Sequence, residues 1–239
     1  MMEAKPILKE NIMRLYSIMQ PQCLKVADLG CSSGPNALQM APRELVNKEN
    51  IYLTSTSPPA MQKAYLEQFQ QDFKRFLKLR SQELVSKGGM VLTLFGRDQT
   101  RDMRTSWRLF GRILNDMVLE NLIEEIKLES FNLPVYDPTI EEAREVIEEE
   151  GSFTLQRLES VTVSYDEGVN EDKKLDVNMR AGIITKQQRA ALEPLFKTQF
   201  GDHVMDELFL RFKNKVVQLI EAKILLEFPT LIISLIKNT

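Results

Sequence analysis

The stretch that decides the fold is Val26-Ala27-Asp28-Leu29-Gly30-Cys31-Ser32-Ser33-Gly34-Pro35-Asn36. Residues 24–29 form a short, mostly apolar run, which is typical of a buried parallel strand. Residues 36–46 then predict a helix that Pro42 would kink or break. A strand that ends in a glycine turn and feeds a helix is the nucleotide-site geometry of doubly wound α/β folds.

The spacing of this turn limits the ligand that it can hold. Gly30 and Gly34 are separated by three residues, which is neither the dinucleotide fingerprint nor a P-loop. Because the turn contains no Lys or Arg, a triphosphate is a poor fit. S-adenosylmethionine fits better, since its carboxylate can sit near the start of a helix. Spacing alone leaves an alternative of about equal weight, a plain tight turn between strand and helix.

The rest of the chain alternates helical and strand-like patterns, which predicts the α/β class. Helices are predicted at residues 7–19, 57–87, 107–126, 139–150, 179–200 and 204–226. Strands are predicted at residues 24–29, 50–53, 90–95, 153–165 and 230–236. Ser57 is the expected cap of the second helix, and Thr139 with Glu142 forms a capping box for the fourth. Gly88-Gly89 separates the predicted helix at 57–87 from the predicted strand at 90–95. A helix followed in this way by a strand predicts an αβ unit of a parallel sheet.

Composition excludes several classes of protein. The chain has 239 residues and a formal net charge of -3, so it lacks the basic footprint of a nucleic-acid-binding protein. The most apolar stretch, residues 224–236, is too short to span a membrane and the N-terminus has no apolar leader. With two cysteines, Cys23 and Cys31, both expected to be free thiols, we expect a cytoplasmic protein without nucleic-acid or membrane partners.

A family resemblance extends over nearly the whole chain. Asp-Leu-Gly-Cys-Ser-Ser-Gly-Pro-Asn at residues 28–36 resembles the first motif of the plant SABATH family, which includes salicylate, benzoate and jasmonate carboxyl methyltransferases and caffeine synthases. Matches continue in family order, for example Asn-Lys-Glu-Asn-Ile-Tyr at 47–52 and Ser-Phe-Asn-Leu-Pro at 130–134. The resemblance implies a Rossmann-like class I methyltransferase core with a helical cap and S-adenosylmethionine as cofactor. It further implies a small carboxylic acid or xanthine as acceptor, and a homodimer.

The resemblance also suggests site residues. The cofactor is expected at the glycine turn, at Asp28, Gly30, Cys31, Gly34 and Asn36. Some members of the family are described with magnesium, and the resemblance places it here at Asn47, Glu129, Phe131 and Asn132. Glu129 stands where the family usually has an aspartate, and oxygen ligands suit magnesium. The alternative is that the Asn and Glu side chains make hydrogen bonds to loop backbone.

One part of the family pattern is missing. Residues 37–46 alone separate the glycine turn from the block at 47–52, and ten residues cannot hold a further βαβ crossover. The family segment that binds the cofactor ribose and holds the acceptor therefore has no counterpart, and central strands are expected to be missing. We expect one methyltransferase-like domain over residues 1–239, with core segments at 1–100 and in part of 151–239. Helical cap segments are expected at about 101–150 and 176–205.

The expected acceptor determines whether methyl transfer needs a catalytic base. A carboxylate is ionised at neutral pH, so its methylation needs positioning rather than a general base, and no catalytic residue is predicted. His203, the single histidine, is expected to be a surface or capping residue. Two functions remain in competition: S-adenosylmethionine-dependent O-methylation of small carboxylic acids, and a non-catalytic family member that associates with a homologue.

Overall fold

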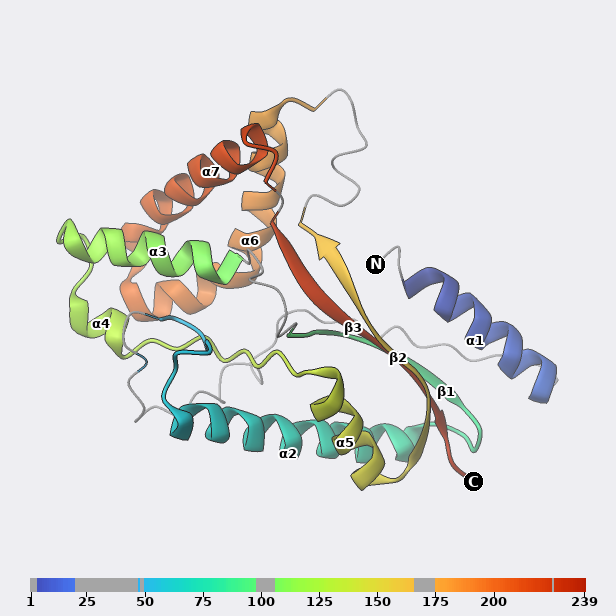
Figure 1. Cartoon of the computed structure of the whole chain (residues 1–239). Helices are drawn as coiled ribbons and strands as arrows, with labels where there is room; N and C mark the ends of the chain where they lie inside the picture. The colour runs from blue at the N-terminus through green and yellow to red at the C-terminus, as the bar shows by residue number, and fades with distance from the viewer. Residues whose placement is uncertain (1–3, 20–46, 48–49, 98–105, 166–174, 225) are drawn as a thin grey trace.

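The computed structural model describes residues 4–19, 47, 50–97, 106–165, 175–224 and 226–239 (Figure 1). The predicted strand at 24–29, the glycine turn and both cysteines lie outside these residues. The described helices are α1 (Ala4–Met19), α2 (Pro59–Glu83), α3 (Ser106–Leu119), α4 (Glu125–Glu129), α5 (Ile140–Glu150), α6 (Val177–Phe200) and α7 (Met205–Glu221), with the short 3-10 helix η2 (Asp202–Val204). The described strands are β1 (Gly89–Phe95), β2 (Phe153–Ser164) and β3 (Glu227–Lys237). The mixed α/β class is therefore confirmed.

The described strands form one three-stranded sheet in the order β1-β3-β2. Both pairings are antiparallel, so the prediction that β1 belongs to a parallel pair is wrong for the neighbour it has here. The reason is that the last strand of the chain, β3, inserts between β1 and β2. A sheet this small agrees with the expectation of a shortened chain.

The central strand β3 contains a proline, Pro229, which lacks the N–H of a ladder bond. The Pro229 carbonyl accepts a hydrogen bond from Gly96 N at 2.9 Å. Pro229 therefore lies opposite Gly96, the residue immediately after the end of β1. On the other side it pairs with Thr162 of β2. Proline is therefore tolerated where the ladder with β1 ends.

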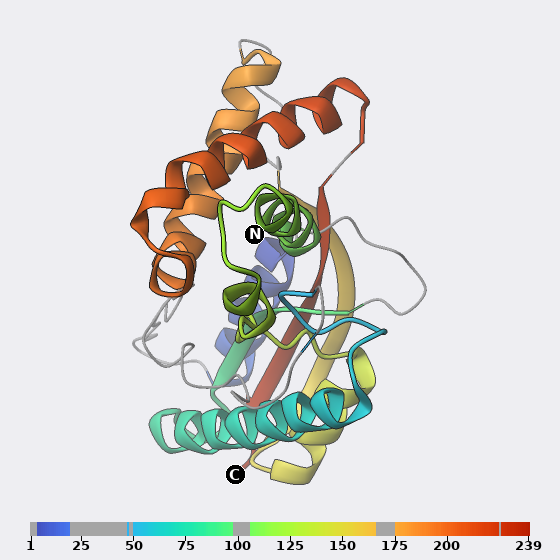
Figure 2. The same cartoon turned by 90° about the vertical axis from the view of Figure 1, so that its left-hand side faces the viewer.

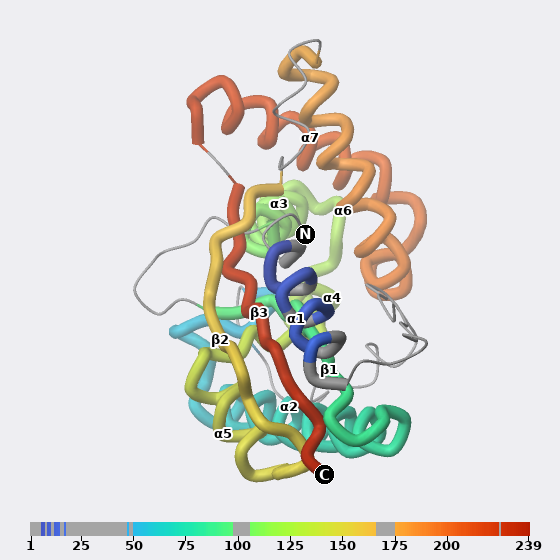
Figure 3. Tube along the Cα trace, turned by 90° about the vertical axis from the view of Figure 1, so that its right-hand side faces the viewer, coloured from blue at the N-terminus to red at the C-terminus, as the bar shows by residue number. Residues whose placement is uncertain are grey.

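Helices cover both faces of the sheet. Phe73 and Leu77 of α2 pack with α5 and with alternate residues of β3 on one face. Helix α1 lies across β1 and β3 on the other face (Figure 3), with Ile7 buried. Arg14 of α1 donates a 2.7 Å hydrogen bond to Gln156 Oε1, at the bulge in β2.

The remaining helices make a separate cluster at the other end of the molecule (Figure 2). Helices α3, α4, α6 and α7 surround Phe110, which is fully buried. The Phe110 ring stacks on Phe212 with a centroid separation of 4.2 Å and also contacts Phe196 at 5.1 Å. Aromatic pairs of this kind add to the stabilisation that their buried area gives.

Some of the helix ends predicted from local sequence signals are confirmed by the structure and others are not. The capping box is confirmed: Thr139 Oγ1 accepts from Glu142 N, the Glu142 carboxylate accepts from Thr139 N, and Gly151 closes α5 with a left-handed backbone. Ser57 is not the cap of α2, because Pro58 holds that position without a side-chain hydrogen bond. Helix α3 ends at Leu119, and a turn precedes α4 within the predicted span 107–126. Helix α7 also ends before its predicted limit, at Glu221.

Residues 50–53, predicted as a strand, form a bent loop instead. The Ile51 carbonyl accepts from Leu133 N at 2.6 Å, and the Tyr52 carbonyl accepts from the Asn47 amide at 2.8 Å. These carbonyls are thus satisfied without a β ladder.

Candidate functional site

The predicted cofactor residues Asp28, Gly30, Cys31, Gly34 and Asn36 all lie outside the described residues. Their role stays a prediction. The structure does describe the predicted magnesium residues and the carboxyl end of β1, where a ligand of an open α/β sheet would be expected.

Asn47, the first predicted magnesium ligand, has a structural role. Its side chain is buried, its amide N–H donates to the Tyr52 carbonyl at 2.8 Å, and its Oδ1 accepts from the Ser57 hydroxyl at 2.8 Å. Ser57 Oγ in turn accepts from Thr54 N. The side-chain amide therefore ties the loop before α2 together, which is the alternative that the sequence left open for this residue.

The other three predicted ligands lie at 129–132, just before Leu133, whose backbone N–H donates to the Ile51 carbonyl of this loop. Glu129 is the last residue of α4 and is half-buried, as is Asn132. The Phe131 ring packs into the helical cluster, 5.1 Å from the Phe200 ring. Among the described residues, no three His, Cys, Asp or Glu side chains come together as a metal site would need. The predicted set contains a single carboxylate, Glu129, and the Asn47 amide oxygen already accepts a hydrogen bond from Ser57. This donor set therefore fits magnesium poorly.

Aromatic side chains gather where β1 ends and β3 begins. The Phe95 ring lies 6.1 Å from Trp107 and 5.0 Å from Phe228, both in edge-on arrangements. The Tyr165 ring lies 4.6 Å from Phe228, and its hydroxyl hydrogen bonds with Ser106 Oγ at 2.8 Å. Burial raises the pKa of Tyr165 to about 12, so its hydroxyl stays protonated near neutral pH. We call Phe95, Trp107, Tyr165 and Phe228 the aromatic wall.

A small polar pocket opens beside the aromatic wall. It has a volume of about 30 Å³ and is lined by Tyr52, Leu53, Arg97, Trp107, Val135 and Asp137. Asp137 Oδ1 is buried and has no hydrogen-bond partner among the described residues. Burial raises the pKa of the Asp137 carboxyl to about 7, although the nearby Arg97 charge opposes the shift. This pocket therefore places a titratable carboxyl next to an aromatic surface.

Arg97 is held in place by several neighbours. Its guanidinium donates to Glu142 Oε1 at 2.9 Å and lies over the Tyr136 ring at 5.6 Å from the centroid. Its backbone N–H donates to the Pro138 carbonyl at 3.0 Å. Burial together with the Glu142 charge raises the pKa of Tyr136. The capping box of α5 thus also orients the cation of the pocket.

Sequence reasoning missed most of this pocket. It placed Trp107 within an expected cap segment, about 101–150, but gave no role to Arg97, Asp137, Tyr165 or Phe228. One weak signal was available: Asp137 stands immediately before Pro138 and the Thr139 cap, at a chain bend that positions polar groups. His203 is exposed in η2, as predicted.

Comparisons with known proteins identify the family. The family model described as SAM dependent carboxyl methyltransferase matches residues 1–43 and 40–238. The chain belongs to this family. The two matched segments meet at residues 40–43, inside the short stretch where the sequence lacks a family segment.

Relatives agree with this assignment. The chain is 43% identical to the salicylate/benzoate carboxyl methyltransferase of Arabidopsis thaliana over 76% of this chain and 48% of that protein. It is 40% identical to a probable caffeine synthase of Coffea canephora over 72% of this chain and 47% of that protein. The solved structure of a loganic acid methyltransferase with SAH matches with a TM-score of 0.66 and 30% identity, over 81% of this chain and 54% of that one.

The methyltransferase fold predicted from the resemblance is thereby confirmed. The family member described here spans about half the length of the relatives that it matches. The division into core and cap segments stays a prediction. No helix in the described ranges is long and apolar enough to cross a membrane.

Proposed function

We propose that this chain carries out S-adenosylmethionine-dependent O-methylation of a small carboxylic acid, with the aromatic wall as the acceptor surface. The observation that carries the proposal is the wall itself, which lies at the carboxyl end of β1 beside a pocket with a titratable carboxyl. Relatives named as a salicylate/benzoate carboxyl methyltransferase and a loganic acid methyltransferase support this class of acceptor. Aromatic surfaces with few polar groups are typical of small-molecule sites.

The cofactor supplies a methyl group on a positively charged sulfur. The residues of the glycine turn, including Cys31 and Asn36, would hold it, as the family resemblance implies. Since an acceptor carboxylate is already ionised at neutral pH, this chain needs to orient it rather than deprotonate it. Good orientation is worth several kcal/mol in such displacements.

In this arrangement the exposed ring of Phe95 and the half-buried ring of Phe228 would cover the apolar body of the acceptor, and the buried Trp107, 6.1 Å from Phe95, would support the wall. Asp137 would tune which acid is accepted, because its ionised form repels a second carboxylate and its protonated form can donate a hydrogen bond. Magnesium has no step in this proposal, since Asn47, Glu129, Phe131 and Asn132 fit a metal poorly.

The first test is calorimetric titration of the purified chain with S-adenosylhomocysteine. Saturable binding is expected, and Gly34→Asp should abolish it by adding bulk and negative charge at the turn. Gly182→Asp is the matched control, because a Cβ at this position of α6 meets no atom within 4 Å. Absence of binding by a folded wild-type chain would refute the proposal, and unchanged affinity in Gly34→Asp would remove the turn from the site.

A second function is favoured by a different observation. The chain spans about half the length of the relatives that it matches, and in the described structure β1 is an edge strand without a fully buried residue. A non-catalytic family member that associates with a homologue would cover this edge. Light scattering of the chain, alone and mixed with a full-length relative, tests this function and also the homodimer. A strictly monomeric chain that forms no complex would exclude it.

A further inference from the structure

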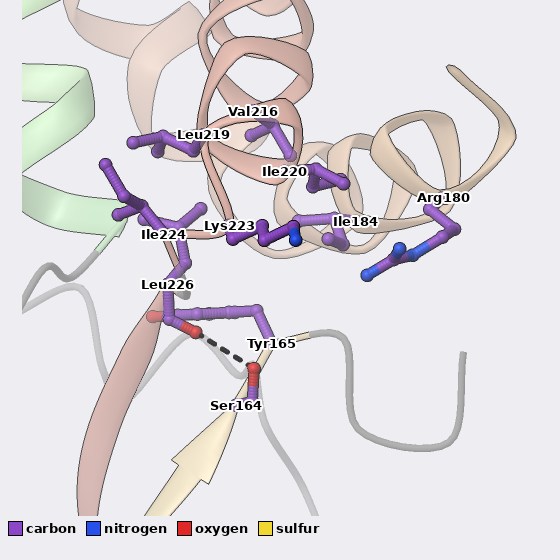
Figure 4. Close-up of a pocket in the computed structure, with 10 residues that line it drawn as sticks. All are labelled: Ser164, Tyr165, Arg180, Ile184, Val216, Leu219, Ile220, Lys223, Ile224 and Leu226. Atoms are coloured by element: carbon purple, nitrogen blue, oxygen red, sulfur yellow. Dashed lines mark hydrogen bonds between the residues drawn. The ribbon is translucent and has the colours of Figure 1, made fainter. Parts of the chain in front are cut away.

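Two cavities of the described structure differ in how their polar groups are satisfied. The larger one, of about 260 Å³, lies beside α6 and the end of α7 (Figure 4), and there Ser164 Oγ already donates to the Leu226 carbonyl at 3.3 Å. The smaller one is the polar pocket beside the aromatic wall, where two atoms have no partner among the described residues. We propose that this pocket binds one hydroxyl group, which water supplies in the free protein and an aromatic ligand supplies when it lies on the wall.

The polar pocket contains one buried acceptor and one buried donor that are both unsatisfied. Asp137 Oδ1 and Arg97 Nε are buried, and neither is hydrogen bonded within the described ranges. The far end of the Arg97 guanidinium is occupied, because Nη2 donates to Glu142 Oε1 at 2.9 Å and to the Tyr136 hydroxyl at 3.4 Å. The proposal therefore uses the Nε–H group of Arg97 and not its charge. Since buried polar atoms nearly always have a partner, these two atoms indicate an occupant.

A hydroxyl group fits this pair of atoms, because its oxygen can accept one hydrogen bond and donate another. It would accept from Arg97 Nε and donate to Asp137 Oδ1. A carboxylate has no proton to donate and is repelled by an ionised Asp137. An ammonium group cannot accept a hydrogen bond, and it would lie beside the Arg97 charge. The two atoms therefore select a neutral O–H group over either kind of ion.

The size of the pocket sets the same limit. Its volume of about 30 Å³ equals the share of one water molecule in the liquid, so it holds one oxygen atom and excludes a whole ring. A ligand hydroxyl that displaces this water reproduces both hydrogen bonds. A ligand group that cannot do so leaves two buried polar atoms unpaired, which lowers its affinity.

The backbone fixes the donor next to the acceptor. Arg97 N donates at 3.0 Å to the carbonyl of Pro138, the residue after Asp137. Gly96 has no room for a side chain, because a Cβ there would lie 2.8 Å from the Leu231 side chain. The chain that leaves β1 is thus held close to β3, and Arg97 is positioned before any ligand binds. Preorganisation of this kind lowers the cost of binding.

Trp107 connects the pocket to the aromatic wall. It lines the pocket, and its ring lies 6.1 Å from the exposed ring of Phe95. In the arrangement proposed, a ligand ring rests on Phe95 and its hydroxyl group enters the pocket. The ligand half of this inference rests on the proposed function, since it uses the same wall, but it requires neither the cofactor nor a carboxylate.

The test titrates the full chain with phenol and with fluorobenzene, which has nearly the same shape but no proton to donate. Trp107 is the single tryptophan of the chain and lines the pocket, so its fluorescence reports binding there. Phenol is expected to change this emission saturably and to bind at least about tenfold more tightly than fluorobenzene, because fluorobenzene leaves Asp137 unpaired. Equal affinity for the two compounds would overturn the proposal.

Variants of the acceptor atom test its role directly. Asp137→Leu should abolish the preference for phenol, whereas Asp137→Asn should keep it, because an amide still hydrogen bonds with a hydroxyl group. Asp116→Leu replaces an exposed carboxyl of α3, and this matched control should keep the full preference. A preference for phenol that survives in folded Asp137→Leu would contradict the assignment.

Crystal structures with and without phenol separate the two sources of the hydroxyl group. The free chain should show one water between Asp137 Oδ1 and Arg97 Nε, and the phenol oxygen should replace it in the complex. A water that stays in place at saturating phenol would overturn the ligand half, and a pocket without water in the free chain would overturn the other half. Loss of the phenol preference while S-adenosylhomocysteine still binds would overturn this inference alone and leave the proposed methyl transfer standing.

Discussion

The helical cluster and the sheet of this protein are completed to different degrees. Helices α3, α4, α6 and α7 enclose a core in which Phe110 is fully buried and stacked on Phe212. In the sheet, residues 231–235 of β3 are all buried, whereas β1 has no fully buried residue. Within the described residues, the chain therefore contains a closed core and a sheet edge, β1, that pairs with a described strand on one side alone.

This difference matches where the family pattern is interrupted. The segment that is short relative to the family lies at residues 37–46, before every described strand and before the cluster helices. Residues from α2 onward follow the family in order, and the helical cluster draws all its helices from this part. All three described strands also come from this part, and β1 has no further neighbour among them, so the outer edge of β1 is where a missing segment is expected to matter.

The largest predicted effect contrasts two phenylalanines. Phe110→Ala should lower the free energy of unfolding by about 3–5 kcal/mol, since it leaves a cavity in a closed core. Phe95→Ala, in a β1 residue that is 42% exposed, should cost about 1–2 kcal/mol. Urea denaturation of both variants measures this. Equal costs would mean that a partner or another part of the chain covers the end of β1.

A second prediction concerns the junction of the two regions, where Asp137 lies between Trp107 of the cluster and Arg97 after β1. Because burial raises the pKa of Asp137 from 3.8 to about 7, the folded state binds a proton more tightly than the unfolded state. Stability from this group is therefore full below pH 4 and is lost as the pH rises towards 7. The loss is at most about 4 kcal/mol, from about three pKa units at 1.36 kcal/mol each.

Asp137→Asn should remove this dependence. The variant is expected to be roughly 2 kcal/mol more stable than wild type at pH 8, with the difference shrinking as the pH falls to 4. Thermal or urea unfolding at several pH values measures it. Asp116→Asn, an exposed carboxyl on α3, is the matched control and should show no such trend. A pH-independent difference for Asp137→Asn would mean that Asp137 is already ionised and paired in the folded protein.

Features that depend on local sequence were predictable, whereas features that depend on contacts between distant parts of the chain were not. Helix α5 was predicted with its limits because the Thr139 and Glu142 cap and the Gly151 stop are local signals. The antiparallel neighbour of β1 was not predicted, because strand order depends on where the last strand inserts, and no local pattern contains that. The aromatic wall was missed for a similar reason: Phe95, Trp107, Tyr165 and Phe228 come from distant parts of the chain and meet only in the folded sheet.

The smallest predicted effect compares a helix cap in each region. Thr139 is buried and shares two reciprocal hydrogen bonds with Glu142, whose carboxylate also accepts from Arg97. Asp176 is exposed and caps α6 through a single 2.8 Å bond from Met179 N. Thr139→Ala should cost about 1–2 kcal/mol and Asp176→Ala about 0.5 kcal/mol, because a buried orphan N–H is more costly than a solvated one.

Urea unfolding of the two cap variants would also show how the regions are linked. Since Arg97 follows β1 and bonds to the capping glutamate, loss of Thr139 should loosen the polar pocket as well as α5. The Thr139→Ala variant should then lose part of the pH dependence assigned to Asp137, whereas Asp176→Ala should keep all of it. If both variants kept the full dependence, the pocket would be held by β1 and α3 alone, and the cap would be a local feature of α5.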